Sequence, residues 1–107
     1  MMNDSKVLNA LGMCRRAGKL GIGMDATIES VRKGAPLVLI AKDASDRTRK
    51  KVKEAAEGLS ETVELDYTMD EIESGVGRKF AVAAVKDKNL AQAVRIALLK
   101  EESINAD

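Results

Sequence analysis

Positively charged side chains crowd the first half of the chain, and groups of this kind could hold phosphates or carboxylates. Residues 1–53 contain twelve Lys and Arg against five Asp and Glu, a balance of +7. Residues 54–107 contain six against twelve, a balance of −6, so that the halves sum to the net charge of +1. One half can attract a polyanion that the other half repels, unless both signs merely solvate helix surfaces.

The basic residues are densest between Arg47 and Lys53, where the pattern predicts the start of a helix. Cations at a helix N-terminus oppose its dipole, and consecutive cations repel one another, so an anion nearby would relieve the cost. If phosphates are that anion, affinity should fall steeply with salt. The basic set comprises Arg15, Arg16, Lys19, Arg32, Lys33, Lys42, Arg47, Arg49, Lys50, Lys51 and Lys53.

The residue types argue against catalysis. The chain has no histidine, which excludes Ser-His and Cys-His nucleophile chemistry. Cys14, the only cysteine, falls in the apolar stripe of a predicted helix, so we interpret it as a core residue, and zinc sites of the Cys/His kind are excluded. Asp43 and Asp46 flank a strand end but are explained by loop polarity and helix capping. We therefore expect no catalytic residue, metal, cofactor or small-molecule substrate.

A glycine motif offers one enzyme-like alternative. Gly21, Gly23 and Ala26 fit the pattern G-x-G-x-x-G/A, and Asp43 lies 20 residues beyond Gly23, as in a dinucleotide site. That fingerprint must follow a buried strand, whereas residues 15–19 contain three cations and a glycine. A chain of 107 residues also cannot hold both halves of a dinucleotide domain. A small nucleotide-binding enzyme is therefore the third alternative, which the position of the turn decides.

Hydrophobic spacing predicts the elements that must position these groups. Residues 36–41 and 80–85 are unbroken apolar runs, which predict strands covered on both faces. Residues 62–67 alternate and predict a half-exposed edge strand, and residues 20–23 predict a short one. The predicted helices are 3–17 with Asn3 or Asp4 as cap, 25–33, one from Ser45 or Asp46 through Leu59, one from Thr68, and one capped by Asp87. The pattern predicts an α/β fold, a three-layer α/β/α sandwich with a central four-stranded mixed sheet.

Length and composition indicate one soluble domain over residues 1–100, followed by a frayed tail over residues 101–107. The N-terminus lacks the pattern of a signal peptide and no apolar run could span a bilayer, so we expect no membrane. A single cysteine suits a cytoplasmic location. Two aromatic residues, Tyr67 and Phe80, are too few for a single-strand binder built on base stacking.

One stretch of the chain resembles a known family. Residues 17–45, A-G-K-L-G-I-G-M-D-A-T-I-E-S-V-R-K-G and A-P-L-V-L-I-A-K-D-A-S, resemble the L-seven-Ae / L-thirty-e family of ribosomal proteins, and look closest to its small bacterial ribosomal-protein-like members. Residues 68–77 and the strand 80–85 are similar to the family's later helix and last strand. The resemblance implies an α/β/α sandwich that binds kink-turn RNA in a translation ribonucleoprotein.

The resemblance also implies where RNA would be held. In the family, a turn and helix start of the type G-T-N-E-x-x-K grip the RNA, and a hydrophobic loop covers a flipped nucleotide. The turn glycine here is Gly23, Lys19 is the upstream lysine, and the loop is Val85-Lys86-Asp87-Lys88. The RNA-binding residues so expected are Arg15, Arg16, Lys19, Gly23, Met24, Asp25, Ala26, Glu29, Lys33, Val85, Lys86 and Lys88.

Some of these positions depart from the family pattern. Asp25 replaces Asn and can accept from guanine N1–H and N2–H2 but cannot donate. Ala26 replaces a hydrogen-bonding Glu, and Glu29 replaces a Lys. Losing two base-reading groups at about 1–3 kcal/mol each lowers specificity by orders of magnitude. The main hypothesis is a structured, ribosomal or kink-turn RNA as partner. The alternative is a protein–protein adaptor of the translation machinery, bound to ribosome-associated proteins.

Overall fold

Helices and strands alternate along the whole described chain. The structure is a computed structural model that describes the backbone of residues 5–105 and the side chains of residues 5–101. The elements are α1 (Lys6–Arg16), β1 (Leu20–Ile22), α2 (Met24–Arg32), β2 (Leu37–Ile40), α3 (Asp46–Ala56), β3 (Glu61–Glu64), α4 (Met69–Val76), β4 (Val82–Val85) and α5 (Lys88–Asn105). The four strands form one sheet in the order β1-β4-β2-β3. Only β2 and β3 run parallel, so the predicted mixed sheet is confirmed.

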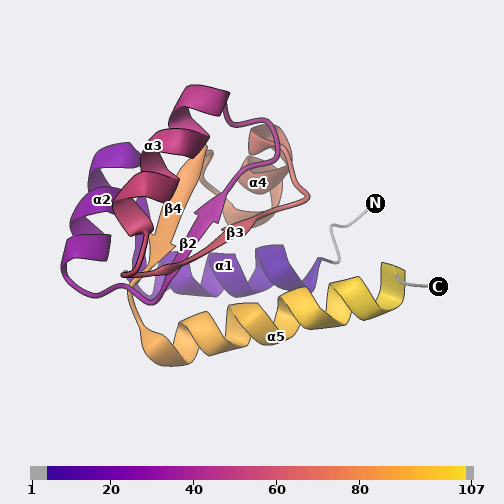
Figure 1. The fold of residues 1–107 in the computed structure, drawn as a ribbon. Coiled ribbons are helices and arrows are strands. Elements are labelled where there is room, and N and C mark those ends of the chain that lie inside the picture. The colour runs from indigo at the N-terminus through magenta and orange to yellow at the C-terminus, as the bar shows by residue number, and fades with distance from the viewer. Residues whose placement is uncertain (1–4, 106–107) are drawn as a thin grey trace.

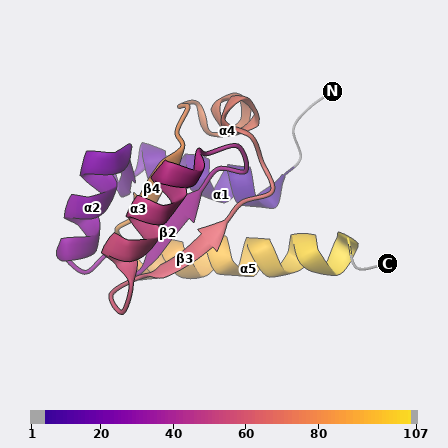
Figure 2. The same ribbon diagram turned by 45° about the horizontal axis from the view of Figure 1, so that its top comes forward.

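The helices cover the sheet on both faces, as Figures 1 and 2 show. α1, α4 and α5 pack on one face, where their side chains share a core cluster with Leu37 and Leu39 of β2. α2 and α3 pack side by side on the other face, over a cluster that contains Val38 and Ile40. The side chains of β2 therefore alternate between two cores. The α/β sandwich predicted from the sequence is confirmed.

The two apolar runs form the middle of the sheet. Every residue of β2 and β4 is buried, and the two strands pair antiparallel with Leu37 opposite Val85 and Ile40 opposite Val82. β3 is an edge strand with its two ends exposed, as predicted, but it covers Glu61–Glu64, so that residues 65–67 of the predicted strand follow it as loop. Continuous hydrophobicity thus identified the strands that have helices on both sides.

Most predicted helix starts are confirmed by hydrogen bonds. The Ser45 hydroxyl accepts from the N–H of Thr48, and Thr68 and Glu71 form both halves of a capping box. The Asp87 carboxylate accepts from the N–H groups of the first turn of α5. The cap of α1 is Ser5, not Asn3 or Asp4, and those two lie outside the described residues. When several polar residues follow one another, the sequence does not determine which of them caps the helix. The position of the first helical turn decides it.

Two predicted features near helix ends differ from the structure. Leu59 was expected on the buried stripe of α3, but the helix ends at Ala56 and the Leu59 side chain is 64% exposed. Gly58, with a φ of +76°, turns the chain away before Leu59 can pack. Residues 101–105, part of the predicted frayed tail, continue α5 as helix, and residues 106–107 lie outside the described range.

The start of this last segment is held by polar contacts. The Glu101 carboxylate accepts from the Ser5 hydroxyl at 2.7 Å and from the N–H of Val7 at 3.2 Å. The Tyr67 hydroxyl lies 2.7 Å from the other Glu101 oxygen and 2.7 Å from the Ser5 hydroxyl. These contacts join α5 to α1 and to the loop before α4. The domain limit predicted at residue 100 stays a prediction.

Candidate nucleic-acid interface

A glycine turn joins β1 to α2 and leaves the start of that helix open. Gly23 is the N-cap, with a φ of +96° and no side-chain hydrogen bond to the helix. Its carbonyl accepts from the N–H of Thr27 at 2.9 Å. The N–H groups of Met24, Asp25 and Ala26 have no acceptor among the described residues. Three donors at the positive end of a helix can therefore bind an anion.

The register of the sheet decides what lies beside this turn. β1 and β4 are antiparallel, and the N–H of Gly23 donates to the Val82 carbonyl at 3.0 Å. At the other end of the same pairing, the N–H of Lys86 donates to the Lys19 carbonyl at 2.9 Å. Lys19 and Gly23 are four steps of extended chain apart, roughly 13 Å. The neighbour of Gly23 is therefore the segment before β4, residues 77–81, rather than residues 85–88.

The structure thus brings together only some of the predicted site residues. Beside the segment before β4 lies Arg15, whose Nε donates to the Val76 carbonyl at 2.8 Å. Asp25 is exposed on the first turn of α2, whereas the Met24 side chain packs against the core. Arg16 is exposed at the end of α1. The predicted residues at or near the opposite end of β4 are Lys19, Glu29, Lys33, Val85, Lys86 and Lys88.

A surface cavity of about 440 Å³ extends from that opposite end to Ala26 in the first turn of α2. It is lined by Ala26, Glu29, Ser30, Lys33, Ala35 and Lys86. The Lys33 ammonium lies 3.1 Å from the Glu29 carboxylate, one helical turn away, so each neutralises the other. Val85 is fully buried, so its side chain is not available to cover a nucleotide. The loop expected to cover one therefore offers RNA only Lys86 and Lys88.

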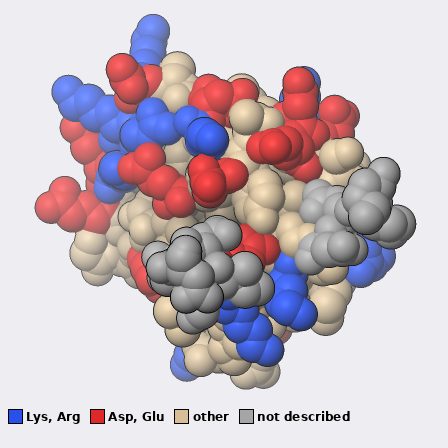
Figure 3. Space-filling view, turned by 90° about the vertical axis from the view of Figure 1, so that its right-hand side faces the viewer, with Lys and Arg blue, Asp and Glu red and all other residues tan. Residues whose placement is uncertain are grey.

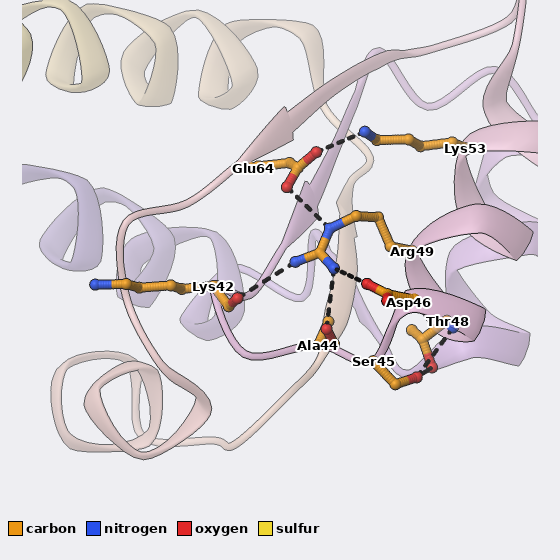
Figure 4. A network of polar contacts seen from close by, with 8 residues as sticks. All are labelled: Lys42, Ala44, Ser45, Asp46, Thr48, Arg49, Lys53 and Glu64. Carbon is orange, nitrogen blue, oxygen red and sulfur yellow. Dashed lines mark hydrogen bonds and ion pairs between the residues drawn. The ribbon is translucent and has the colours of Figure 1, made fainter.

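The basic run of α3 is partly neutralised within the protein (Figure 4). Arg49 donates through Nε to Glu64 at 2.9 Å and through Nη1 to the Ala44 carbonyl at 3.1 Å. Lys53 contacts the other oxygen of Glu64. The hydrogen bond from Lys53, helped by Arg49, holds the pKa of Glu64 below its usual value. Arg49 and Lys53 therefore need no external anion, contrary to the expectation for the whole run.

Sequence reasoning missed the cations beside the glycine turn. Arg78 and Lys79 are exposed in the segment before β4. Lys79 lies 2.8 Å from Asp70, and this hydrogen bond raises the pKa of the lysine, whereas Arg78 has no ion pair among the described residues. Gly77 has a φ of +94°, and a Cβ there would lie 2.9 Å from the Arg15 guanidinium. The available signal was the sequence G-V-G-R-K directly before an apolar run.

Other classes of site find little support in the described part of the chain. It contains no cluster of three acidic or cysteine side chains that could hold a metal ion. None of its helices has the length and apolar character needed to cross a bilayer.

Figure 3 shows the face on which α1 begins and α5 ends, where acidic and basic side chains are interspersed. A uniform positive field is therefore not a property of that face.

Comparison with known proteins identifies the family. The chain is 33% identical over 91 residues to a protein of Enterococcus faecium named RNA-binding protein YlxQ. The match covers 84% of this chain and 88% of that protein. The chain belongs to the YlxQ family. No protein-family model matches it.

Solved structures share the fold of this YlxQ-family chain. A Bacillus halodurans protein of unknown function superposes with a TM-score of 0.76 at 22% identity, covering 88% of this chain and 97% of its own. The Giardia lamblia 15.5kD RNA binding protein superposes with a TM-score of 0.68 at 20% identity, covering 96% and 92%. At these identities the likeness concerns the fold alone.

The dinucleotide alternative does not fit this member of the YlxQ family. In that site a strand precedes the first glycine and pairs parallel with the next strand, whereas Gly21 lies in the middle of β1, an edge strand antiparallel to β4. A Cβ on Gly21 would lie 2.7 Å from the Ser30 hydroxyl and 3.2 Å from the Ala26 carbonyl. Gly21 therefore allows α2 to pack closely on β1.

Proposed function

We propose that the chain is a non-catalytic RNA-binding protein of the cytoplasm, of the L-seven-Ae / L-thirty-e type. We infer that its partner is a structured, kink-turn-like RNA, held at the Gly23 turn. The observation that carries this proposal is the set of unpartnered N–H groups in the first turn of α2. The Enterococcus faecium relative named as an RNA-binding protein supports it.

Each group at this turn has a separate role in the proposed interface. The three N–H groups donate to a phosphate or a base edge, which the absence of a Cβ on Gly23 lets approach closely. The Asp25 carboxylate accepts from the Watson–Crick edge of a guanine. Arg78, and the Arg15 nitrogens not bonded to Val76, bind phosphate. Shape and backbone contacts thus contribute more than base reading.

The remaining predicted residues have secondary roles in this proposal. Lys19, Lys86 and Lys88 contact RNA only where it extends along β1 to the far end of the sheet. Lys33 is paired with Glu29, and Val85 is buried, so neither contributes a free contact. Arg16 adds a general electrostatic attraction from the end of α1. The proposed core of the interface therefore comprises Arg15, Gly23, Met24, Asp25, Ala26 and Arg78.

A titration with two RNAs tests the proposal. We expect the protein to bind a kink-turn RNA more tightly than an unkinked duplex of equal length. Asp25→Ala should mainly erode this preference, whereas Arg16→Glu should weaken both complexes. Equal weak binding to both RNAs, or none to either, would contradict specific recognition. If neither substitution changes binding, the interface lies elsewhere.

A protein–protein adaptor of the translation machinery is the second candidate function. It is favoured by the exposed apolar side chains on α5, with Ile96 at 44% and Leu99 at 63% exposure. Its partners would be ribosome-associated proteins. Salt separates the two candidates, because an RNA complex weakens log-linearly with salt while an apolar protein interface hardly responds.

A further inference from the structure

The basic side chains of α3 fall into two groups. Arg49 and Lys53 contact Glu64 of β3 (Figure 4). Arg47, Lys50 and Lys51 are exposed and have no ion pair among the described residues. The first group therefore stabilises the fold through Glu64, whereas the second group has no ion-pair partner among the described residues.

The second group shares one outer face of the helix. Arg47 and Lys51 are one turn apart and lie about 40° from each other around the axis, and Lys50 lies about 60° from Arg47 on its other side. Val52 and Ala56 of the same helix are buried on the opposite side. Like charges at this spacing repel, and Arg47, in the first turn, also opposes the helix dipole. Keeping three cations there costs stability that no contact in the described chain offsets.

The topology places this face beside the proposed RNA site. β1 and β2 both run antiparallel to β4, so both end at the same edge of the sheet. α2 and α3 follow these strands, pack side by side, and therefore begin at that edge (Figure 1). Arg49 and Lys53 lie on the flank of α3 toward β3, so the other flank faces α2. Helical spacing therefore puts Lys51 on the flank toward α2 and Arg47 on the outer surface of α3.

We propose that Arg47, Lys50 and Lys51 bind the phosphate backbone of a duplex stem that adjoins the RNA site at Gly23. The proposal rests on the proposed function, because it extends the same interface along α3. The charge of this face favours a phosphate backbone as its ligand. The face carries cations that have no partner among the described residues, and it has no aromatic or large apolar side chain. Contacts of this kind position a stem without reading its sequence.

Two double variants with the same charge change test the α3 contact. Lys50→Gln/Lys51→Gln removes two cations from α3, and Lys6→Gln/Lys100→Gln removes two exposed cations from the opposite layer. Each is titrated with a kink-turn RNA whose stem is cut to a few base pairs, and with one whose stem extends for a full helical turn. Urea unfolding of each variant controls for stability.

We expect the α3 variant to bind the long-stem RNA about tenfold more weakly, with a salt slope reduced by about 1.5. Its affinity for the short-stem RNA should match that of the Lys6→Gln/Lys100→Gln control. If the α3 variant and the control behave alike on the long-stem RNA, the α3 contact is wrong while the Gly23 site stands. If the unaltered protein binds neither RNA, both proposals fail.

Discussion

The N–H of Gly23 donates to the Val82 carbonyl across 3.0 Å, and this bond joins the turn before α2 to the first residue of β4. Residues 21 and 84 are paired in the same ladder, so the bond continues the sheet beyond the last pair. The open start of α2 and the segment of residues 77–81 are thereby held at one edge. A substitution that shifts either segment should therefore displace the other through this hydrogen bond.

Gly23→Ala should lower both stability and RNA affinity. Gly23 has a φ of +96° and a ψ of 167°, a region that side chains avoid at a cost of about 1–3 kcal/mol. Gly34→Ala is the matched control, because Gly34 also has a φ of +96° but lies beyond the other end of α2. Urea unfolding should show a lower free energy of unfolding for both variants. If RNA affinity falls equally in both, strain rather than position explains it.

Arg78→Gln should weaken binding of a short kink-turn RNA several-fold and reduce the salt slope by about 0.7–0.9, one phosphate contact. Lys88→Gln makes the same charge change at the opposite end of β4 and should leave this RNA unaffected. Fluorescence anisotropy at several salt concentrations measures both quantities. A larger effect of Lys88→Gln would move the interface to the cavity end of the sheet.

Glu64→Gln should remove a pH-dependent part of the stability. The pKa of Glu64 in the folded protein is below its usual 4.5, chiefly because of the hydrogen bond from Lys53. Its contribution is therefore complete above pH 4.5 and is lost as the pH falls through the folded pKa. The urea midpoints of the two proteins should differ at pH 7 and converge as the pH falls through the folded pKa. A constant difference across this range would assign the effect to packing.

Cys14 should make stability fall at high pH. Burial raises the pKa of its thiol from 9.0 to about 11, so between these values the unfolded chain loses a proton that the folded chain keeps. Stability relative to Cys14→Ala should decline as the pH rises above 9.0 and level off near 11. Urea unfolding of both proteins at pH 8, 10 and 11 measures it. An unchanged difference would mean that the thiol ionises equally in both states.

Tyr67→Phe should loosen the end of α5. The hydroxyl lies 2.7 Å from a Glu101 oxygen, and its loss costs about 1–2 kcal/mol because a carboxylate loses a donor. Hydrogen exchange should accelerate at the start of α1 and around residues 97–101. Glu101→Gln keeps only one of the two acceptor oxygens and should also destabilise this contact. Uniform acceleration through the sheet would show global rather than local destabilisation.

The elements were predictable because their signals are local. The unbroken apolar runs of residues 36–41 and 80–85 identify the two central strands, and Thr68 with Glu71 marks a helix start three residues apart. Each signal lies within one element and needs no knowledge of its neighbours. The fold class follows from the alternation of such elements.

The site was only partly predictable because its geometry depends on strand order. Gly23 was identified, but its neighbour is decided by the antiparallel pairing of β1 with β4, which no local pattern encodes. For the same reason residues 85–88 were expected beside it and Arg78 was not. Glu64 lies 15 residues from Arg49 in the chain, so the neutralisation of that cation was equally invisible.

The strand order has a consequence for the protein while it is being synthesised. β4 is the last strand of the chain, yet it lies between β1 and β2. Until residues 82–85 have left the ribosome, β1 has no partner strand and the Gly23 N–H has no acceptor. The open start of α2 therefore takes up its position only after β4 has been made. Any ligand that needs this turn binds only chains in which β4 has paired with β1.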